Sequence, residues 1–301
     1  MVKIYLSYSV LAEYKKCPHA FFNRYIKELV PKPWDGPLDW GSPLEFGHLL
    51  HMFMQHWLWG VPFEDVKKLV NEEAQTLDII KVPDEANRSL LHLWDTIENA
   101  KEYFEQDPFK FWKPIVLEPE VEWKVGDFTT KSGKKYEVYF RSHFDGVAEL
   151  PDGRTVVLEH KTTSQPFSQF EKRLKPNAQV SSYAHAMRHH TDWSFDGVLF
   201  TAVNTRRYKD PSKYEQVRQY MVDCPLWESD EWFEHTQRTI KKLLEDIEDG
   251  IFSRGDDPNV CTMFGQCKFI KLCSQSPLGR ADTEKRLFLK EPWKGFEIKH
   301  D

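Results

Sequence analysis

The sequence contains no apolar run that approaches the roughly 18 residues of a membrane-spanning helix. Its first residues, MVKIYLSYSVLAEYKKC, lack both the long apolar stretch and the small-residue cleavage site of a secretory signal. A GxxxxGK[ST] phosphate-binding motif is absent, so no fused P-loop helicase is expected. There are only five cysteines in 301 residues, too few to indicate a disulfide-rich secreted domain. Together these absences predict a cytoplasmic protein with no membrane segment.

The composition is that of a folded chain. Hydrophobic residues make up 40% and aromatic residues 14%, with eleven tryptophans, so a large core can be buried. The net charge of -6 argues against general electrostatic adhesion to nucleic acid. Between Lys161 and Arg218, however, ten basic residues face five acidic ones. Such a local excess suits a phosphate backbone, although a solvated protein face has the same appearance.

Hydrophobic periodicity predicts helices first, then a β-meander, a helix and further strands. Ser42 and Pro43 indicate the start of one helix, which Gly60 ends. The predicted helices cover 7–26, 42–60, 62–78, 84–107, 177–190 and 230–250, and the predicted strands cover 115–125, 136–150, 154–163, 196–204 and 214–222. This order predicts an α/β fold with a mixed sheet flanked by helices.

One segment, DGVAELPDGRTVVLEHK at 145–161, brings charged residues to both sides of a turn signal. Asp152 and Gly153 after Pro151 predict a tight reversal between two strands. Asp152 is midway between positions 145 and 159, so Asp145 and Glu159 are expected to lie opposite each other. Facing carboxylates destabilise a sheet unless a positive group lies between them.

A divalent cation is the simplest group to lie between these carboxylates. Glu159 and Lys161 are two apart on the predicted strand and share a face, whereas His160 points to the other side. Two carboxylates bind a hard ion such as Mg²⁺ well, with water and phosphate completing the coordination. The alternative is an ordinary surface ion pair of Lys161. The run VVLE before these charges predicts a strand buried on both faces, which favours the metal site.

These residues resemble a known family. FDGV followed by LEHKTT is similar to the PD-(D/E)XK nuclease superfamily, in particular to its RecB-like branch. That branch also has a Gly-x-x-x-His motif on an early helix, here Gly47 to His51 in GHLLH, and a Gln-x-x-x-Tyr motif after the catalytic hairpin, here Gln179 to Tyr183 in QVSSY. The resemblance covers about residues 5–275.

The resemblance implies a restriction-endonuclease-like fold with a mixed central sheet, an N-terminal helical insertion and a C-terminal cysteine cluster. It divides the chain into N-terminal helices at 1–60, a helical insertion at 61–112, a nuclease core at 113–225 and a C-terminal region at 226–301. It assigns catalytic roles to Asp145, Glu159, Lys161, Gln179 and Tyr183, and Mg²⁺ or Mn²⁺ binding to His51, Asp145, Glu159 and the backbone carbonyl of His160. Without the motif, His51 would be interpreted as a packed or surface residue of its helix, and Tyr183 as a core residue of an ordinary amphipathic helix.

The cysteines form a second pattern. Cys261, Cys267 and Cys273 are spaced C-x5-C-x5-C, and Cys17 lies near the N-terminus. Four thiolates suit zinc or an iron-sulfur cluster, and spacing does not separate the two. The resemblance to CRISPR-associated and AddB-like nucleases implies a 4Fe-4S cluster held by these four residues. The family more often has Cys-x-x-Cys first, and Phe264 occupies the position where that spacing would place a cysteine.

The implied reaction is metal-dependent hydrolysis of DNA, with single-stranded DNA as the expected substrate of an exonuclease in recombination, repair or CRISPR and phage DNA processing. A partner helicase, recombination or CRISPR protein would supply any unwinding. Trp94, Tyr103 and Phe104 could stack bases, although core packing explains them as well. Two alternatives stay open at this stage: a non-catalytic DNA-binding scaffold, and a zinc-containing endonuclease.

Overall fold

The structure is a computed structural model that describes residues 1–32, 42–106, 112–207, 215–255, 257–262, 266–293 and 295–300. It contains two compact units, each built from separate stretches of the chain. Unit 1 comprises Met1–Asp35, Val121–Ser142 and Asp230–Asp301, and unit 2 comprises Gly36–Glu120 and His143–Ser229. The division predicted from the sequence follows chain order and stays a prediction. No helix in the described part of the chain is long and apolar enough to cross a membrane.

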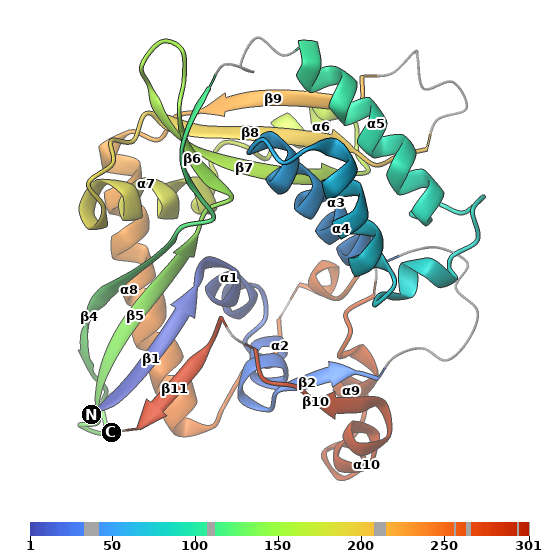
Figure 1. Cartoon of the computed structure of the whole chain (residues 1–301). Coiled ribbons are helices and arrows are strands. Elements are labelled where there is room, and N and C mark those ends of the chain that lie inside the picture. The colour runs from blue at the N-terminus through green and yellow to red at the C-terminus, as the bar shows by residue number, and fades with distance from the viewer. Residues whose placement is uncertain are drawn as a thin grey trace. The chain divides into compact units, whose positions relative to one another are not determined.

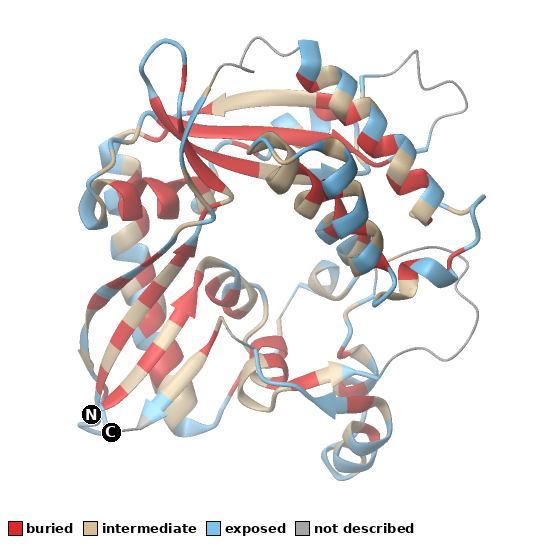
Figure 2. Ribbon diagram, viewed as in Figure 1, coloured by how far each residue is buried: buried red, intermediate tan, exposed pale blue. Residues whose placement is uncertain are grey.

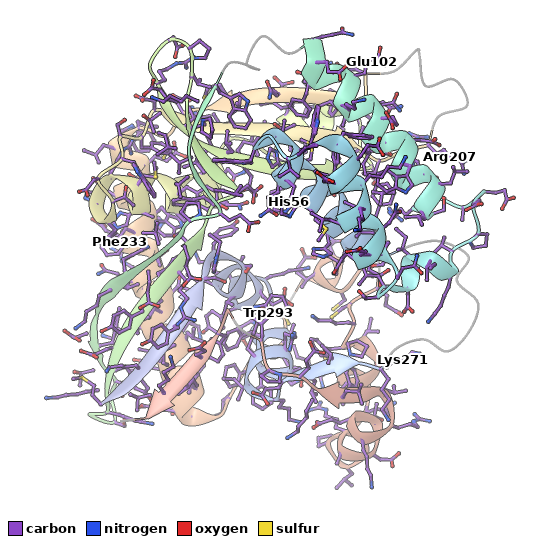
Figure 3. All side chains as sticks on the ribbon, in the orientation of Figure 1. His56, Glu102, Arg207, Phe233, Lys271 and Trp293 are labelled. Carbon is purple, nitrogen blue, oxygen red and sulfur yellow. The ribbon has the colours of Figure 1, made fainter. Side chains whose placement is uncertain are left out.

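Unit 1 contains a four-stranded sheet in the order β11-β1-β5-β4. The strands are β1 (Val2–Ser7), β4 (Glu120–Thr129), β5 (Lys135–His143) and β11 (Glu297–His300). β1 runs parallel to β5 and antiparallel to β11. Aromatic residues of the long helix α8 (Leu226–Asp249) cover this sheet. Phe233, labelled in Figure 3, contacts Trp123 at 5.8 Å between ring centroids, and Trp232 contacts Phe140 at the same separation.

The remaining elements of unit 1 are short. They are α1 (Tyr8–Lys16), α2 (Pro18–Phe21), a π-helix (Phe22–Ile26), β2 (Leu29–Pro31), a 3-10 turn (Pro258–Cys261), α9 (Ile270–Cys273), α10 (Pro277–Leu287) and β10 (Phe288–Lys290), with β2 paired to β10. The stretch 7–26, predicted as one helix, instead forms three helical segments with a break at Cys17. The chain is extended at Cys17, with φ -160° and ψ 102°, because a residue before proline avoids the helical conformation.

Unit 2 contains a five-stranded mixed sheet in the order β3-β6-β7-β8-β9 (Figure 1). The strands are β3 (Lys113–Leu117), β6 (Gly146–Glu149), β7 (Thr155–Thr163), β8 (Gly197–Asn204) and β9 (Val217–Val222). Among the described residues of this sheet, β7 and β8 pair in parallel and the other neighbouring strands pair antiparallel. The predicted hairpin register is confirmed, since Gly146 lies opposite Leu158 and Val147 opposite Val157, which centres the turn on Asp152.

Helices cover both faces of the β7–β8 pair. α3 (Pro43–Leu58) packs on β7 and on α4 (Phe63–Ala74), followed by a 3-10 turn (Asp78–Lys81) and α5 (Leu90–Gln106). α6 (Phe167–Glu171) and α7 (Ala178–His190) follow β7. Every residue of β8 is buried, as Figure 2 shows, and a parallel strand covered on both sides requires such a continuous apolar run. The α/β class with a mixed sheet and flanking helices is confirmed.

Two predicted strands are each divided in the structure. The stretch 136–150 forms β5 and β6, which belong to different sheets, and 115–125 forms the end of β3 and the start of β4. Asp145 lies at the first break, and Glu118 lies at the second with a left-handed φ of 43°. Periodicity continues across both breaks, so the sequence pattern did not reveal them.

Helices α3, α4 and α5 share one apolar core with Val203 and Val217 of the sheet. Phe104 is buried there, and Trp94 and Tyr103 pack against the same cluster of apolar side chains. Of the two interpretations of these aromatic residues, core packing is the one that the described contacts support.

Candidate active site

Glu159 lies at the end of the buried part of β7, and its carboxylate is held from three sides. Its side chain is only 4% exposed. Gln179 Nε2 donates to Oε1 at 3.0 Å, and the Tyr183 hydroxyl donates to Oε2 at 2.8 Å. The Lys161 ammonium group pairs with Oε1. A buried carboxylate requires such partners, because an unpaired charge in the interior is costly.

Helix α7 supplies two of these partners because its start is fixed. The Asn177 side chain accepts hydrogen bonds from the backbone N–H groups of Gln179 and Val180, which caps the helix. Gln179 and Tyr183 are four residues apart and so lie on one face. Gln179 Nε2 also lies 2.6 Å from the Tyr183 hydroxyl oxygen, so the two side chains bind the carboxylate as a connected pair.

Asp145 occupies the break between β5 and β6, beside Glu159. Its Oδ2 accepts the backbone N–H of His160 at 2.6 Å, and its Oδ1 lies 3.0 Å from His51 Nε2. The next residue, Gly146, has room for no side chain, because a Cβ there would come within 2.8 Å of the Trp59 ring. The close approach of α3 to β6 thus requires glycine immediately after the aspartate.

His51 reaches Asp145 from α3. This helix begins as predicted, with Pro43 in its first turn and Ser42 accepting a hydrogen bond from Glu45 N–H at 3.4 Å. Two other histidines lie on α3. His48 Nε2 instead contacts Glu73 at 3.1 Å, and His56, labelled in Figure 3, lies in the last turns of the helix.

The electrostatics of the His51–Asp145 pair favour a charged imidazole. Burial lowers the pKa of His51, but Asp145, then Glu118 and Glu159, outweigh that effect and leave it above its ordinary value. Burial would raise the pKa of Asp145, yet the hydrogen bond from His51 and the neighbouring histidines bring it below its usual range. Both shifts favour an ion pair between the two groups, whose nearest side-chain atoms lie 3.0 Å apart.

Glu159 differs from Asp145 in this respect. Burial raises the pKa of Glu159, and the charge of Lys161 offsets only part of the increase. Burial and the two carboxylates also raise the pKa of Tyr183 well above its ordinary value, so Tyr183 stays a donor. Burial lowers the pKa of His160 to about 4, which keeps that imidazole neutral.

This donor set fits a divalent cation. Two carboxylates and an imidazole are ligand types that Mg²⁺ and Mn²⁺ accept. All the oxygens of Asp145 and Glu159 bond to neighbouring side chains or backbone in this structure, so an ion would replace some of those contacts. The Nδ1 atom of the buried His160 ring has no hydrogen-bond partner among the described residues.

The structure brings the predicted site residues together within unit 2, and their roles stay predictions. The residues are His51, Asp145, Glu159, His160, Lys161, Gln179 and Tyr183. Sequence reasoning missed Glu118, whose charge raises the pKa of His51 and whose N–H donates to the Asp145 carbonyl at 3.4 Å. Glu118 has no local sequence signal, because it is the pairing of β3 with β6 that brings it beside Asp145.

The four predicted cluster cysteines all belong to unit 1. Cys17, Cys267 and Cys273 pack against one apolar cluster around Phe269, and Cys267 N–H donates to the Cys261 carbonyl at 2.8 Å. Burial raises the pKa of Cys273. The charge of Arg254 offsets part of this increase, and the other three thiols add to it. Within the described residues, however, no three of these sulfurs lie within 4.8 Å of one another, so they form no closed ligand set in this structure.

Cys224 belongs to unit 2, where it is buried and its pKa is raised by that burial. Phe264 lies outside the described residues.

Some basic residues of the segment after β7 have local partners. Lys175 pairs with Asp223, and Arg218 pairs with Glu215. Arg188 donates to the backbone carbonyl of Cys224. Lys209 and Lys213, two of the ten basic residues of the segment, lie outside the described residues.

Sequence comparison gives the same assignment as the geometry. The family model of the PD-(D/E)XK nuclease superfamily matches residues 5–274. The chain belongs to this superfamily. PD-(D/E)XK nucleases typically use a divalent metal ion, in agreement with the donor set around Asp145 and Glu159.

The chain is also similar to solved structures. One is a candidate exonuclease from Eubacterium rectale, with 11% identity, a TM-score of 0.49, and coverage of 93% of this chain and 92% of that chain. Another is the protein designated SSO0001, with 15% identity, a TM-score of 0.30, and coverage of 75% and 84%. No curated protein matches the sequence.

Proposed function

We propose that this PD-(D/E)XK protein is a Mg²⁺- or Mn²⁺-dependent deoxyribonuclease that degrades single-stranded DNA from an end. The observation that carries the proposal is the meeting of Asp145, Glu159 and Lys161 at the end of one buried strand. Interior charges are costly, and the fold places several of them where hydrophobic residues would pack more cheaply. Such an arrangement is characteristic of a functional site.

Each residue has a role that follows from its surroundings. Asp145, Glu159, His51 and the His160 carbonyl would hold the ion, which supplies a lowered water pKa and neutralises charge that develops on the phosphate. Gln179 and Tyr183 keep the Glu159 carboxylate oriented. Lys161, with a side chain 39% exposed and paired with Glu159, would turn toward a phosphate oxygen or the attacking water when substrate binds.

The preference for an exonuclease and for DNA comes from the resemblance to the RecB-like branch. The sequence has no phosphate-binding loop for ATP, so a helicase, recombination or CRISPR-type partner would open duplex DNA for this enzyme.

We also propose a 4Fe-4S cluster bound by Cys17, Cys261, Cys267 and Cys273. A tetrahedral zinc site with Zn–S bonds of about 2.3 Å places its sulfurs about 3.8 Å apart. Among the described residues no three of these sulfurs lie within 4.8 Å of one another, and the choice of an iron-sulfur cluster over zinc comes from the resemblance to the iron-sulfur members of the RecB-like branch. The N–H of Gly255 donates to Cys17 Sγ at 3.4 Å, the kind of hydrogen bond that cysteine ligands of iron-sulfur clusters accept.

A cleavage assay tests the nuclease proposal. End-labelled linear and circular single-stranded DNA are incubated with the protein in Mg²⁺, in Mn²⁺ and in EDTA. Loss of the linear form alone, dependent on metal, is expected. Glu159→Ala should abolish cleavage and retain DNA binding, whereas Glu149→Ala, an exposed carboxylate on the same hairpin, should cleave normally. Binding without cleavage by the wild type would favour a scaffold, and cutting of circles would favour an endonuclease.

The cluster proposal has its own test. Anaerobically purified protein is analysed for iron, sulfide and zinc and for visible absorbance. Cys273→Ser should lose iron, whereas Cys224→Ser should retain it. Iron-free wild-type protein from an anaerobic preparation would remove the cluster from the proposal without affecting the nuclease site.

A further inference from the structure

A cavity of ≈ 340 Å³ adjoins the proposed catalytic residues in unit 2. It lies between the first turns of α3 and the ends of β7 and β8. The polar side chains of its lining are His48, His51, His160, Lys161 and Thr162. Its apolar side chains are Pro43, Leu44, Leu50, Met54 and Val203. The cavity therefore combines proposed metal ligands and Lys161 with an apolar surface.

The polar part of the lining is suited to the phosphate. Lys161 carries a positive charge, and no carboxylate is among the described residues that line the cavity. A phosphodiester placed against Lys161 would lie beside Asp145 and Glu159, where hydrolysis is proposed. The group that enters the rest of the cavity is then the nucleoside next to that phosphate.

The apolar surface is suited to a nucleobase. Leu50, Met54 and Val203 are buried and form a fixed apolar surface, whereas Leu44 is 85% exposed in the first turn of α3. Such side chains offer nothing to phosphate oxygens or sugar hydroxyls. They do pack against the faces of a base, as apolar side chains do in pockets that receive unstacked bases.

Gly47 is an independent indication that a ligand approaches α3 here. Glycine in a helix interior costs about 1 kcal/mol relative to alanine. A Cβ at this position would meet only the Thr162 side chain, at 3.4 Å, so packing alone does not require the absence of a side chain. Gly47 also lines the cavity. A glycine there leaves the helix backbone open to close approach by a flat group.

We infer that this cavity binds one unpaired nucleobase adjacent to the scissile phosphate, an inference that rests on the proposed nuclease function. Its volume is near the lower end of the range of about 300–1,000 Å³ for ligand sites. A base has to leave its pair and its stack before it can enter a cavity lined by α3, β7 and β8. Recognition of the base in the cavity thus selects single-stranded DNA over an intact duplex.

The test is an abasic scan of the substrate. A set of single-stranded oligonucleotides carries one abasic residue at successive positions, and cleavage of each bond is compared with that of the unmodified strand in Mn²⁺. One position next to the scissile phosphate should show a loss of about 5- to 100-fold in kcat/KM, the range for loss of one protein-contacted base. The other positions should show little change.

Two variants connect that loss to the cavity. In Leu44→Ala the unmodified strand should be cleaved more slowly, and the abasic penalty should shrink because the contact is already absent. Leu91→Ala, an exposed leucine of α5 outside the cavity, should retain the full penalty. Gly47→Ala should be at least as stable as the wild type and yet bind the unmodified strand more weakly.

The outcomes separate this inference from the nuclease proposal. Equal cleavage of all abasic strands, or an unchanged penalty in Leu44→Ala, overturns the base site and leaves the nuclease intact. If the wild type cleaves nothing, equilibrium binding of the same oligonucleotides in Ca²⁺ gives the answer. Weaker binding of one abasic strand, lost in Leu44→Ala, supports the base site without catalysis, and equal binding of all strands rejects it.

Discussion

The hydrogen bond from Tyr183 to Glu159 gives a quantitative prediction about the metal-free site. In Tyr183→Phe the ring should stay in place, because it is buried and contacts Phe144 edge-on at 4.9 Å. Only the hydroxyl group is lost. Glu159 Oε2 then loses the partner that lies 2.8 Å away, whereas Oε1 retains Gln179 and Lys161.

The cost should depend on pH. Hydrogen bonds to charged groups contribute about 1.5–3 kcal/mol, and those to neutral groups about 0.5–1.5 kcal/mol. Burial raises the pKa of Glu159 in the folded state above its value in the unfolded state. Ionising this carboxylate therefore lowers the stability of the wild-type fold as the pH rises through the folded-state pKa. Removing the phenol raises the pKa of Glu159 further. The destabilisation by Tyr183→Phe should therefore be full at pH 8 and should shrink as the pH falls through the folded pKa of Glu159.

Urea unfolding in EDTA, followed by tryptophan fluorescence between pH 5 and 8, measures this difference. The chain has two compact units, which can unfold in separate transitions. The transition of unit 2 is identified as the one that shifts when Mg²⁺ replaces EDTA in the buffer. Tyr14→Phe is a matched control, since the Tyr14 hydroxyl donates to Asp246 at 2.6 Å within unit 1. It should destabilise the protein and leave the Mg²⁺-sensitive transition unchanged. A Tyr183→Phe penalty below about 0.5 kcal/mol, or one equal at both pH limits, would refute the reasoning.

Three further predictions concern the elements that position the site. Asp145 raises the pKa of His51, so metal binding below that pKa must displace a proton from the imidazole. Mn²⁺ affinity measured by calorimetry should therefore increase with pH up to the folded-state pKa of His51, and His51→Gln should flatten this pH dependence. Gly146→Ala should destabilise unit 2 by about 1–3 kcal/mol in urea, because its Cβ would clash with the Trp59 ring, and unchanged stability would contradict that packing. Asn177→Ala should cost about 1 kcal/mol through loss of the α7 cap, with Asn177→Asp restoring it.

The sequence alone determined the local features that carry the chemistry. The turn at Asp152 fixes the hairpin register, because strand pairing around a short turn leaves one arrangement that buries the apolar residues of β7. Side chains four apart on a helix share a face whatever the tertiary context, so the pairing of Gln179 with Tyr183 followed from spacing. The start of α3 at Ser42 and Pro43 was likewise a local matter.

Only the tertiary structure decided which long-range partners complete the site. Three histidines lie on α3, and the approach of that helix to the sheet is what selects His51 as the partner of Asp145. Asp145 lies at the break between β5 and β6, and Glu118 lies beside it at the break between β3 and β4. Both breaks exist because neighbouring residues of one chain belong to two different sheets. Hydrophobic periodicity reports which face of a strand is buried, but it contains no information about which sheet buries it.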